Sequence, residues 1–252
     1  MASIKNLKRR IRVLSGTKKI AKAIGLMATI KFQKTIDIIK THEVYLKNLE
    51  DTYNRTFVIP REFCGKILIV FSSDKGLCGS YNQNIFKVLK NSEKEYRKIL
   101  YIGKKVKDLM KGKDFENLPL SFEGFKIFSD KIYAEYEKGF QIDCLYANYK
   151  NFFSQEYGIH TLCDLSKKEE ESFLVFKEGE LFEKNIEKLY FSWQLYSYFL
   201  NGFLTEQSAR MQVTESMKKN SDNLVKTLQI KVNKIRQALI TKELSEIVGG
   251  MI

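Results

Sequence analysis

Residues 3–30, with the sequence SIKNLKRRIRVLSGTKKIAKAIGLMATI, predict the architecture of the first part of the chain. One frame of alternating three- and four-residue steps runs along this stretch to Phe32, and Ile39 follows seven residues later: Ile4, Leu7, Ile11, Leu14, Lys18, Ala21, Gly25, Ala28, Phe32, Ile39. This heptad spacing is typical of a coiled-coil seam, and the small side chains in its middle allow a partner helix to approach closely. We expect a helix from near Ser3 to near Phe57, roughly 80 Å long.

The end of the chain shows a similar spacing. Apolar residues step mostly by threes and fours, with wider gaps at Ala209 and Ser221: Phe199, Phe203, Val213, Met217, Leu224, Leu228, Val232, Ile235, Leu239. Gly249-Gly250 follow as a helix stop, so a second helix from about Leu189 would reach roughly 80 to 90 Å. Helices of this length cannot bury an apolar stripe in a local core. The first runs toward the middle of the chain and the last runs away from it, so we expect an antiparallel two-helix coiled coil.

The middle of the chain reads as an α/β domain. Strands are expected at Lys66–Phe71, Ile99–Ile102 and Cys144–Asn148, and helices at about 82–90 and 104–110. Strand and helix alternate at about 32 residues, as βαβ units do. Gly158–Leu165 and Ser172–Phe176 are interpreted as edge strands around a solvated hairpin tip at 167–171. The predicted domains are therefore 1–58 (helix), 59–188 (α/β) and 189–252 (helix).

The net charge of +13 is concentrated at the start of the chain. Residues 1–59 hold 13 Lys+Arg against 4 Asp+Glu, and the first acidic residue is Asp37. Such a segment should seek an acidic partner, whether protein, phosphate or anionic lipid. No stretch approaches the roughly 20 apolar residues of a membrane span, and the start lacks the apolar run of a signal peptide. These features predict a soluble, cytosolic protein.

Candidate chemistry is sparse. The four cysteines have no CxxC spacing, and His42 and His160 are interpreted as ordinary surface or boundary residues, so no metal site is expected. The turn Ser72–Gly79 follows a strand, but it lacks a phosphate-loop motif. Gly76 and Gly79 are more simply explained as permitting a tight turn. Cys78 has no nearby histidine to act as its base. Nucleic-acid binding by the basic first helix stays open, although no aromatic residue precedes Phe32.

Three motifs resemble the gamma subunits of F-type rotary ATPases. TKKIAKAIGLMATIK at 17–31 follows the pattern T-x-K-I-x-K-A-M-x-M-V-A-x-x-K without a gap, and Ser72–Gly79 resembles the SSDRGLCG turn. The end of the chain agrees at further positions with the spacings of that family: Ala209-Arg-Met211, Asn233, Arg236-Gln-Ala238, Ile240-Thr241 and Glu243–Gly250.

The resemblance implies a coiled coil standing inside a ring of three alpha and three beta subunits. An inserted Rossmann-like domain would form the foot, next to an epsilon-type subunit and the membrane rotor ring. Catalysis would belong to the beta subunits, with no cofactor in this chain, no nucleic acid as partner, and a peripheral place on the cytoplasmic face of the membrane. Ile24, Gly25, Thr214 and the short chain depart from the family pattern. A paralogous motor that is not coupled to ion transport therefore stays open beside the synthase.

Seven residues are predicted to contact the alpha/beta ring. The basic face of the first helix should meet acidic loops through Arg9, Arg10, Lys19 and Lys22. On the last helix the resemblance implies contacts by Arg236, Gln237 and Thr241. Arg210 and Met211 are left unassigned between packing within the coil and contact with a partner.

Overall fold

The computed structural model describes residues 2–55, 62–110, 115–116, 118, 121–163 and 180–249. The chain divides into two compact units, one made of Met1–Ala28 and Arg210–Ile252 and the other of Thr29–Ala209. These units are defined by compactness, whereas the boundaries expected at 58/59 and 188/189 follow the ends of the long helices. The expected division into domains stays a prediction.

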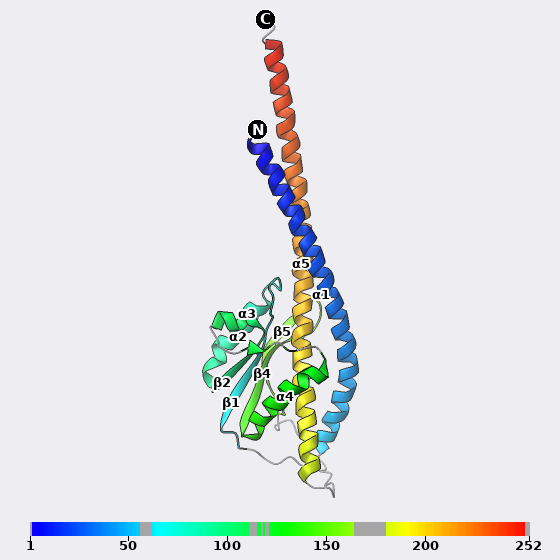
Figure 1. Ribbon diagram of the computed structural model, residues 1–252, viewed down its shortest axis with the longest axis vertical. Helices are drawn as coiled ribbons and strands as arrows, with labels where there is room; N and C mark the ends of the chain where they lie inside the picture. Colours follow the sequence, from blue (N-terminus) through cyan, green and yellow to red (C-terminus); the bar gives the residue numbers. More distant parts are fainter. Residues whose placement is uncertain are drawn as a thin grey trace. The chain divides into compact units, whose positions relative to one another are not determined.

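Two long helices dominate the fold (Figure 1). Helix α1 spans Ala2–Arg55, and α5 spans Glu180–Gly249, so each contributes to both units. The predicted extent of the first helix is confirmed within two residues at its C-terminal end. Helix α5 begins earlier than the expected Leu189 and ends at the first glycine of the predicted stop.

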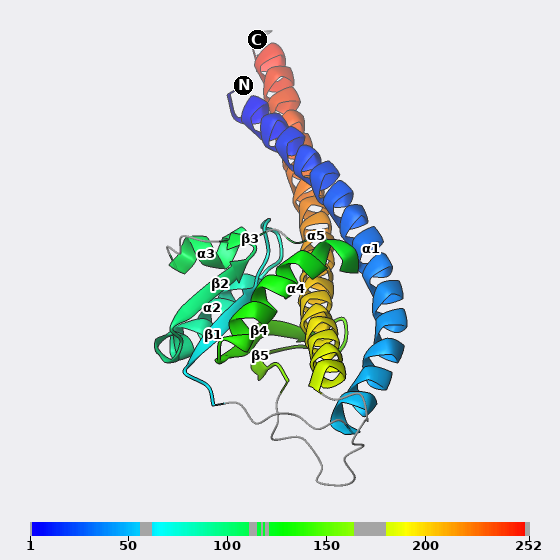
Figure 2. The ribbon, with the colours of Figure 1, turned by 60° about the horizontal axis from the view of Figure 1, so that its bottom comes forward.

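In the first unit, α1 and α5 pair as an antiparallel coil (Figures 1 and 2). Lys18 Nζ lies 2.6 Å from Asp222 Oδ1, and Gly25 lies against Thr214, so rising numbers on α1 meet falling numbers on α5. Ala21 and Ala28 are both 1% exposed. The small residues on α1 therefore form the tightest part of the seam, as predicted.

The seam on α5 agrees with the predicted one from Leu228 onward, at Leu228, Val232, Ile235 and Leu239, and differs from it before Leu228. Leu224 is 52% exposed, whereas Thr214 and Ser221 are buried. Buried and half-buried positions repeat every three or four residues: Thr214, Lys218, Ser221, Val225, Leu228, Val232, Ile235, Leu239. Only small side chains fit against Ala21, Gly25 and Ala28, and Thr214 Oγ1 donates to the carbonyl of Arg210 at 2.8 Å. The sequence prediction placed only apolar residues in the seam of α5, so it did not include the buried hydroxyl residues Thr214 and Ser221.

The second unit holds a five-stranded sheet in the order β3-β2-β1-β4-β5. Strands β1 (Gly65–Phe71), β2 (Lys98–Ile102), β3 (Phe115–Glu116) and β4 (Phe140–Tyr149) are parallel, and β5 (Gln155–Thr161) pairs antiparallel with β4. The three main predicted strands are confirmed. The edge strand expected at Gly158–Leu165 lies earlier, because Leu162 and Cys163 form a turn. The expected strand Ser172–Phe176 and the tip at 167–171 lie outside the described residues.

Helices cover both faces of this sheet (Figure 2). Ile67, Ile69 and Phe71 face a core that contains α5, the 29–55 part of α1 and α4 (Phe122–Glu137). Leu68 and Val70 face α2 (Tyr81–Ser92) and α3 (Lys104–Met110), with the short 3-10 turn η1 (Glu93–Glu95) leading into β2. The alternation explains why β1 reads as a continuous apolar run, because a parallel strand is buried on both sides.

Candidate functional site

The basic residues predicted on α1 lie on the surface of the coiled-coil unit. Arg9, Arg10, Lys19 and Lys22 are all exposed, and none of them forms an ion pair with a described residue. Lys18, one residue from Lys19, instead turns to the seam and pairs with Asp222. Lys18 therefore joins the two helices, whereas the four predicted contact residues are available to other molecules.

Arg9 and Arg10 share a groove along the coil. Its other lining residues are Asn6, Val13, Leu14, Leu224 and Leu228, and its volume is about 670 Å³. Two guanidinium groups beside an apolar floor suit a partner segment that offers both a carboxylate and an apolar side chain.

The three residues predicted on α5 are also exposed. Thr241 Oγ1 donates to the carbonyl oxygen of Gln237 at 3.0 Å, which places these two on one helix face. Arg236 precedes them on the adjoining face. The structure brings Arg9 and Arg10 together, and Gln237 and Thr241 together, and it shows no contact between the two pairs among the described residues.

Exposed apolar side chains form a second candidate contact surface, which the sequence prediction did not include because all of its contact residues were polar. Val13, Ile20 and Met27 repeat every seven residues on α1 and are 62%, 60% and 57% exposed. Every residue of α5 from Ile240 to Gly249 is exposed, and these include Leu244 and Ile247. The signal was present in the sequence as a second heptad series, offset from the seam. Exposed apolar side chains that repeat along one helix face are candidates for contact with a partner.

Arg210 and Met211 behave differently from these contact candidates. Arg210 is only 7% exposed and Met211 is half-buried. Burial of a guanidinium requires partners within the protein, and it leaves little surface for a further contact. This favours the packing role for Arg210.

The Ser72–Gly79 turn uses its polar groups internally. Asn82 Nδ2 donates to Ser73 Oγ at 2.7 Å and to Cys78 Sγ at 3.1 Å. Gly79 has the positive φ of 59° that its proposed role in the turn requires, whereas the second left-handed residue is Leu77 and not Gly76. Cys78 is 2% exposed, so the turn reads as a structural junction between β1 and α2.

The structure also bears on metal clusters, membrane-spanning helices and the two histidines. Among the described residues no cluster of His, Cys, Asp or Glu could hold a metal ion, and no helix is long and apolar enough to cross a bilayer. His160 is exposed as expected. The expectation for His42 was wrong, because its side chain is 3% exposed and packs between Trp193 and Tyr196.

Comparison with known proteins identifies the family. A family model described as ATP synthase matches residues 3–252. The ATP synthase gamma chain of Mycoplasmopsis pulmonis is 30% identical, with 100% of each chain covered. The chain belongs to the family of ATP synthase gamma chains. A gamma chain from Clostridium acetobutylicum is 28% identical over 97% of this chain and 95% of its own.

Solved structures agree with this family at the level of the fold. A chain in the OSCP/F1/c-ring structure of the Euglena gracilis mitochondrial ATP synthase matches with a TM-score of 0.75 and 16% identity, covering 99% of this chain and 94% of that one. A chain in the rotor structure from the same organism matches with a TM-score of 0.72 and 15% identity, covering 95% and 99%. The predicted fold class, long terminal helices with an inserted α/β domain, is confirmed as that of a gamma chain.

Proposed function

We propose that this gamma chain is the central rotor shaft of an F-type ATP synthase or ATPase, and that it couples rotation to conformational change in an alpha/beta ring. The observation that carries the proposal is the surface of the coiled-coil unit. Unpaired cations on α1 and exposed apolar residues on both helices cover a helix pair whose own seam is already filled. Such a surface is suited to an enclosing partner.

The mechanism rests on asymmetry. A shaft can bias the conformation of a surrounding subunit only through contacts whose free energy differs between the conformations of that subunit. The groove with Arg9 and Arg10 lies on one side of the coil, and the face with Gln237 and Thr241 lies on α5 alone. Each orientation of the shaft therefore offers a different set of charged and apolar groups to each surrounding subunit.

Catalysis in this proposal belongs to the beta subunits. The sequence holds no phosphate-loop motif. Within the Ser72–Gly79 turn, Ser73 hydrogen-bonds to Asn82 of α2, and Ser72 Oγ donates to the carbonyl oxygen of Ile102 at the end of β2. The isolated chain should not bind ATP with micromolar affinity in equilibrium dialysis. The α/β unit would serve as the foot, against an epsilon-type subunit and the membrane rotor ring on the cytoplasmic face.

Co-purification tests the proposal. A tagged copy of the full chain, expressed in its source cells, should recover alpha- and beta-type subunits together with a membrane ring. Recovery of the alpha/beta head without a ring would instead favour a motor that is not coupled to ion transport. Recovery of nucleic acid without either subunit would contradict the shaft and revive the nucleic-acid alternative, which the family assignment disfavours.

A further inference from the structure

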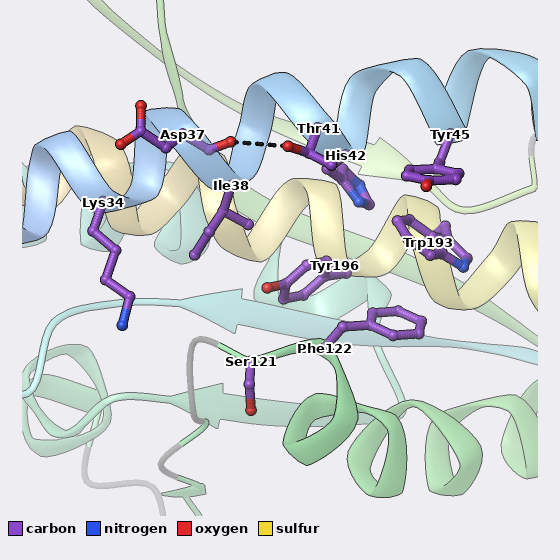
Figure 3. Close-up of a pocket in the computed structure, with 10 residues that line it drawn as sticks. All are labelled: Lys34, Asp37, Ile38, Thr41, His42, Tyr45, Ser121, Phe122, Trp193 and Tyr196. Carbon is purple, nitrogen blue, oxygen red and sulfur yellow. Dashed lines mark hydrogen bonds between the residues drawn. The ribbon is translucent and has the colours of Figure 1, made fainter.

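Aromatic side chains are exposed at three described positions of the unit Thr29–Ala209: Tyr45, Phe63, Phe153. The ring of Tyr45 leans on Trp193 with the centroids 5.5 Å apart (Figure 3). The ring of Phe63 leans on Tyr136 at 6.0 Å. Phe153 is 87% exposed, more than any other large apolar side chain in the described part of the chain, although its ring meets Phe152 edge-on at 5.2 Å. Phe153 therefore projects from the unit into solvent.

Phe153 belongs to the tip of the hairpin that joins β4 to β5. The side-chain Oδ1 of Asn151 accepts hydrogen bonds from the backbone N–H groups of Phe153 and Ser154, at 2.9 and 2.8 Å. Lys150 Nζ and Glu156 Oε2 pair at 3.0 Å across the base of the tip. Asparagine side chains that bond to the backbone two residues further on hold a turn in one conformation. The phenyl ring is thus presented by a loop that is already ordered, which lowers the entropy cost of binding a partner.

Both long helices hold this hairpin close to one end of the α/β unit. On α5, Ser208 Oγ donates to the carbonyl oxygen of Phe152 at 3.4 Å, one residue before the unit ends. On α1, the ring of Phe32 meets that of Tyr149 at 5.6 Å, three residues after the unit begins. The tip therefore lies at the end of the α/β unit from which both helices continue into the coiled-coil unit.

We propose that Phe153 is an anchor residue for the alpha/beta ring and that it inserts into an apolar pocket at the rim of one ring subunit. The inference rests on the proposed function, because a ring that encloses the coil must end where the two helices enter the α/β unit. Aromatic side chains buried in a partner's pocket are among the residues that contribute most to protein–protein binding. Such a partner would remove from water a phenyl ring that the free chain leaves exposed.

This contact would add to the asymmetry of the shaft. The chain has one such hairpin, whereas the proposed ring offers three equivalent positions to it. As the shaft turns, Phe153 would leave the pocket of one subunit and enter that of the next. Its contact therefore differs between the surrounding subunits at every orientation, which is the property required of a contact that biases their conformations.

Photocrosslinking identifies the partner directly. The full chain with the substitution Phe153→benzoylphenylalanine is reconstituted with alpha, beta and epsilon-type subunits and irradiated without ATP. We expect one crosslink per head, from this chain to a single alpha or beta subunit. The matched control is Phe63→benzoylphenylalanine, because Phe63 is also exposed but precedes the amino end of β1, whereas the tip follows the carboxyl end of the parallel strand β4. The control should give no crosslink to alpha or beta.

The substitution Phe153→Ser separates binding from folding. Because the side chain is exposed in the free chain, the variant should keep the wild-type melting temperature. Its affinity for the alpha/beta head, measured by isothermal titration calorimetry, should fall about tenfold, as expected for loss of an aromatic anchor. Phe63→Ser should bind the head as tightly as the wild type does.

Two results would overturn the proposal and leave the shaft intact. One is a tip that crosslinks to the epsilon-type subunit, to a second copy of this chain or to nothing, in heads that hydrolyse ATP. The other is equal affinity of Phe153→Ser and the wild type for the alpha/beta head. A wild-type chain that does not assemble with alpha and beta subunits at all would contradict the shaft itself, and the anchor with it.

Discussion

His42 makes the stability of the α/β unit depend on pH. Its pKa in the folded protein is lowered to about 4 from 6.5, because burial disfavours the imidazolium. Below pH 6.5 the unfolded chain therefore binds a proton at His42 that the folded chain does not bind. The free energy of unfolding decreases as the pH falls from 6.5 to about 4, where His42 is protonated in the folded protein as well. Tyr196, whose pKa burial raises to about 12, stays neutral throughout this window.

We expect the wild type to lose about 2 kcal/mol more unfolding free energy between pH 7 and pH 5 than His42→Phe does, since each pH unit is worth about 1.4 kcal/mol. Urea unfolding followed by Trp193 emission measures both proteins, and the variant removes the titrating group while keeping the aromatic contact. Equal losses of unfolding free energy in the two proteins would show that His42 is hydrated in the folded protein.

Gly25 and Gly16 form a matched pair on α1. A Cβ on Gly25 would lie 2.8 Å from Thr214 Oγ1, whereas a Cβ on Gly16 meets nothing within 4 Å. Alanine favours a helix over glycine by about 1 kcal/mol, but overpacking a seam costs about 1 to 3 kcal/mol. Gly16→Ala should raise the melting temperature of the coil, and Gly25→Ala should lower it.

The double variant Gly25→Ala with Thr214→Ala tests the cause of that loss. Removing the hydroxyl relieves the clash, so the double variant should melt above Gly25→Ala in far-UV circular dichroism. If Gly25→Ala stabilises the coil as much as Gly16→Ala does, the helices are not in close contact at this point.

Elements differ in how far the sequence could predict them. The long helices and β1 follow from strong periodicity and from a continuous apolar run. Helix α4 was missed although Phe125, Phe128, Ile132 and Tyr136 are buried at helical spacing, because its N-cap Ser121 is not followed by the usual acidic pattern three residues later. The burial of His42 depends on Trp193, which lies far away in sequence, and no local pattern indicates that contact.

The coiled-coil unit should be the less stable element in the free chain. Its helices bury one stripe each, and Ile240–Gly249 is exposed throughout, whereas Ile67–Phe71 is buried on both faces. Amide exchange depends on such differences in local burial. Residues 4–28 and 215–249 should exchange much faster than 66–71 in the isolated protein. Equal protection in all three segments would mean that the coil needs no enclosing partner.

At the scale of the whole molecule, torque should be carried by many weak contacts. Exposed ion pairs are worth about 0 to 1 kcal/mol each, and charge-assisted hydrogen bonds about 1.5 to 3 kcal/mol. Single Ala substitutions should therefore reduce ATPase turnover of the reconstituted head only modestly, at each of these positions: Arg10, Lys19, Lys22, Arg236, Gln237, Thr241. Thr241→Ala should have the smallest effect, because its hydroxyl already bonds to Gln237.

Combined substitutions should cost much more. The double variant of Arg236 and Gln237, or the triple variant of Arg10, Lys19 and Lys22, should lower turnover and also weaken the coupling of hydrolysis to rotation. The control is a triple Ala variant of Lys40, Lys47 and Lys126, which are exposed on the other unit. It removes three positive charges outside the coiled-coil unit, and it should leave the turnover of the reconstituted soluble head unchanged. One single variant that abolishes activity while the complex still assembles would replace distributed contacts with a single essential one.

Rotation of the chain itself is the most direct test of the shaft. Cys64 is exposed, whereas Cys78, Cys144 and Cys163 are buried, so a bead can be attached through one natural thiol. With the alpha/beta head fixed to a surface, ATP should drive the bead in one direction, in steps of one third of a turn. A head that assembles with the labelled chain and hydrolyses ATP while the bead stays still would contradict the account.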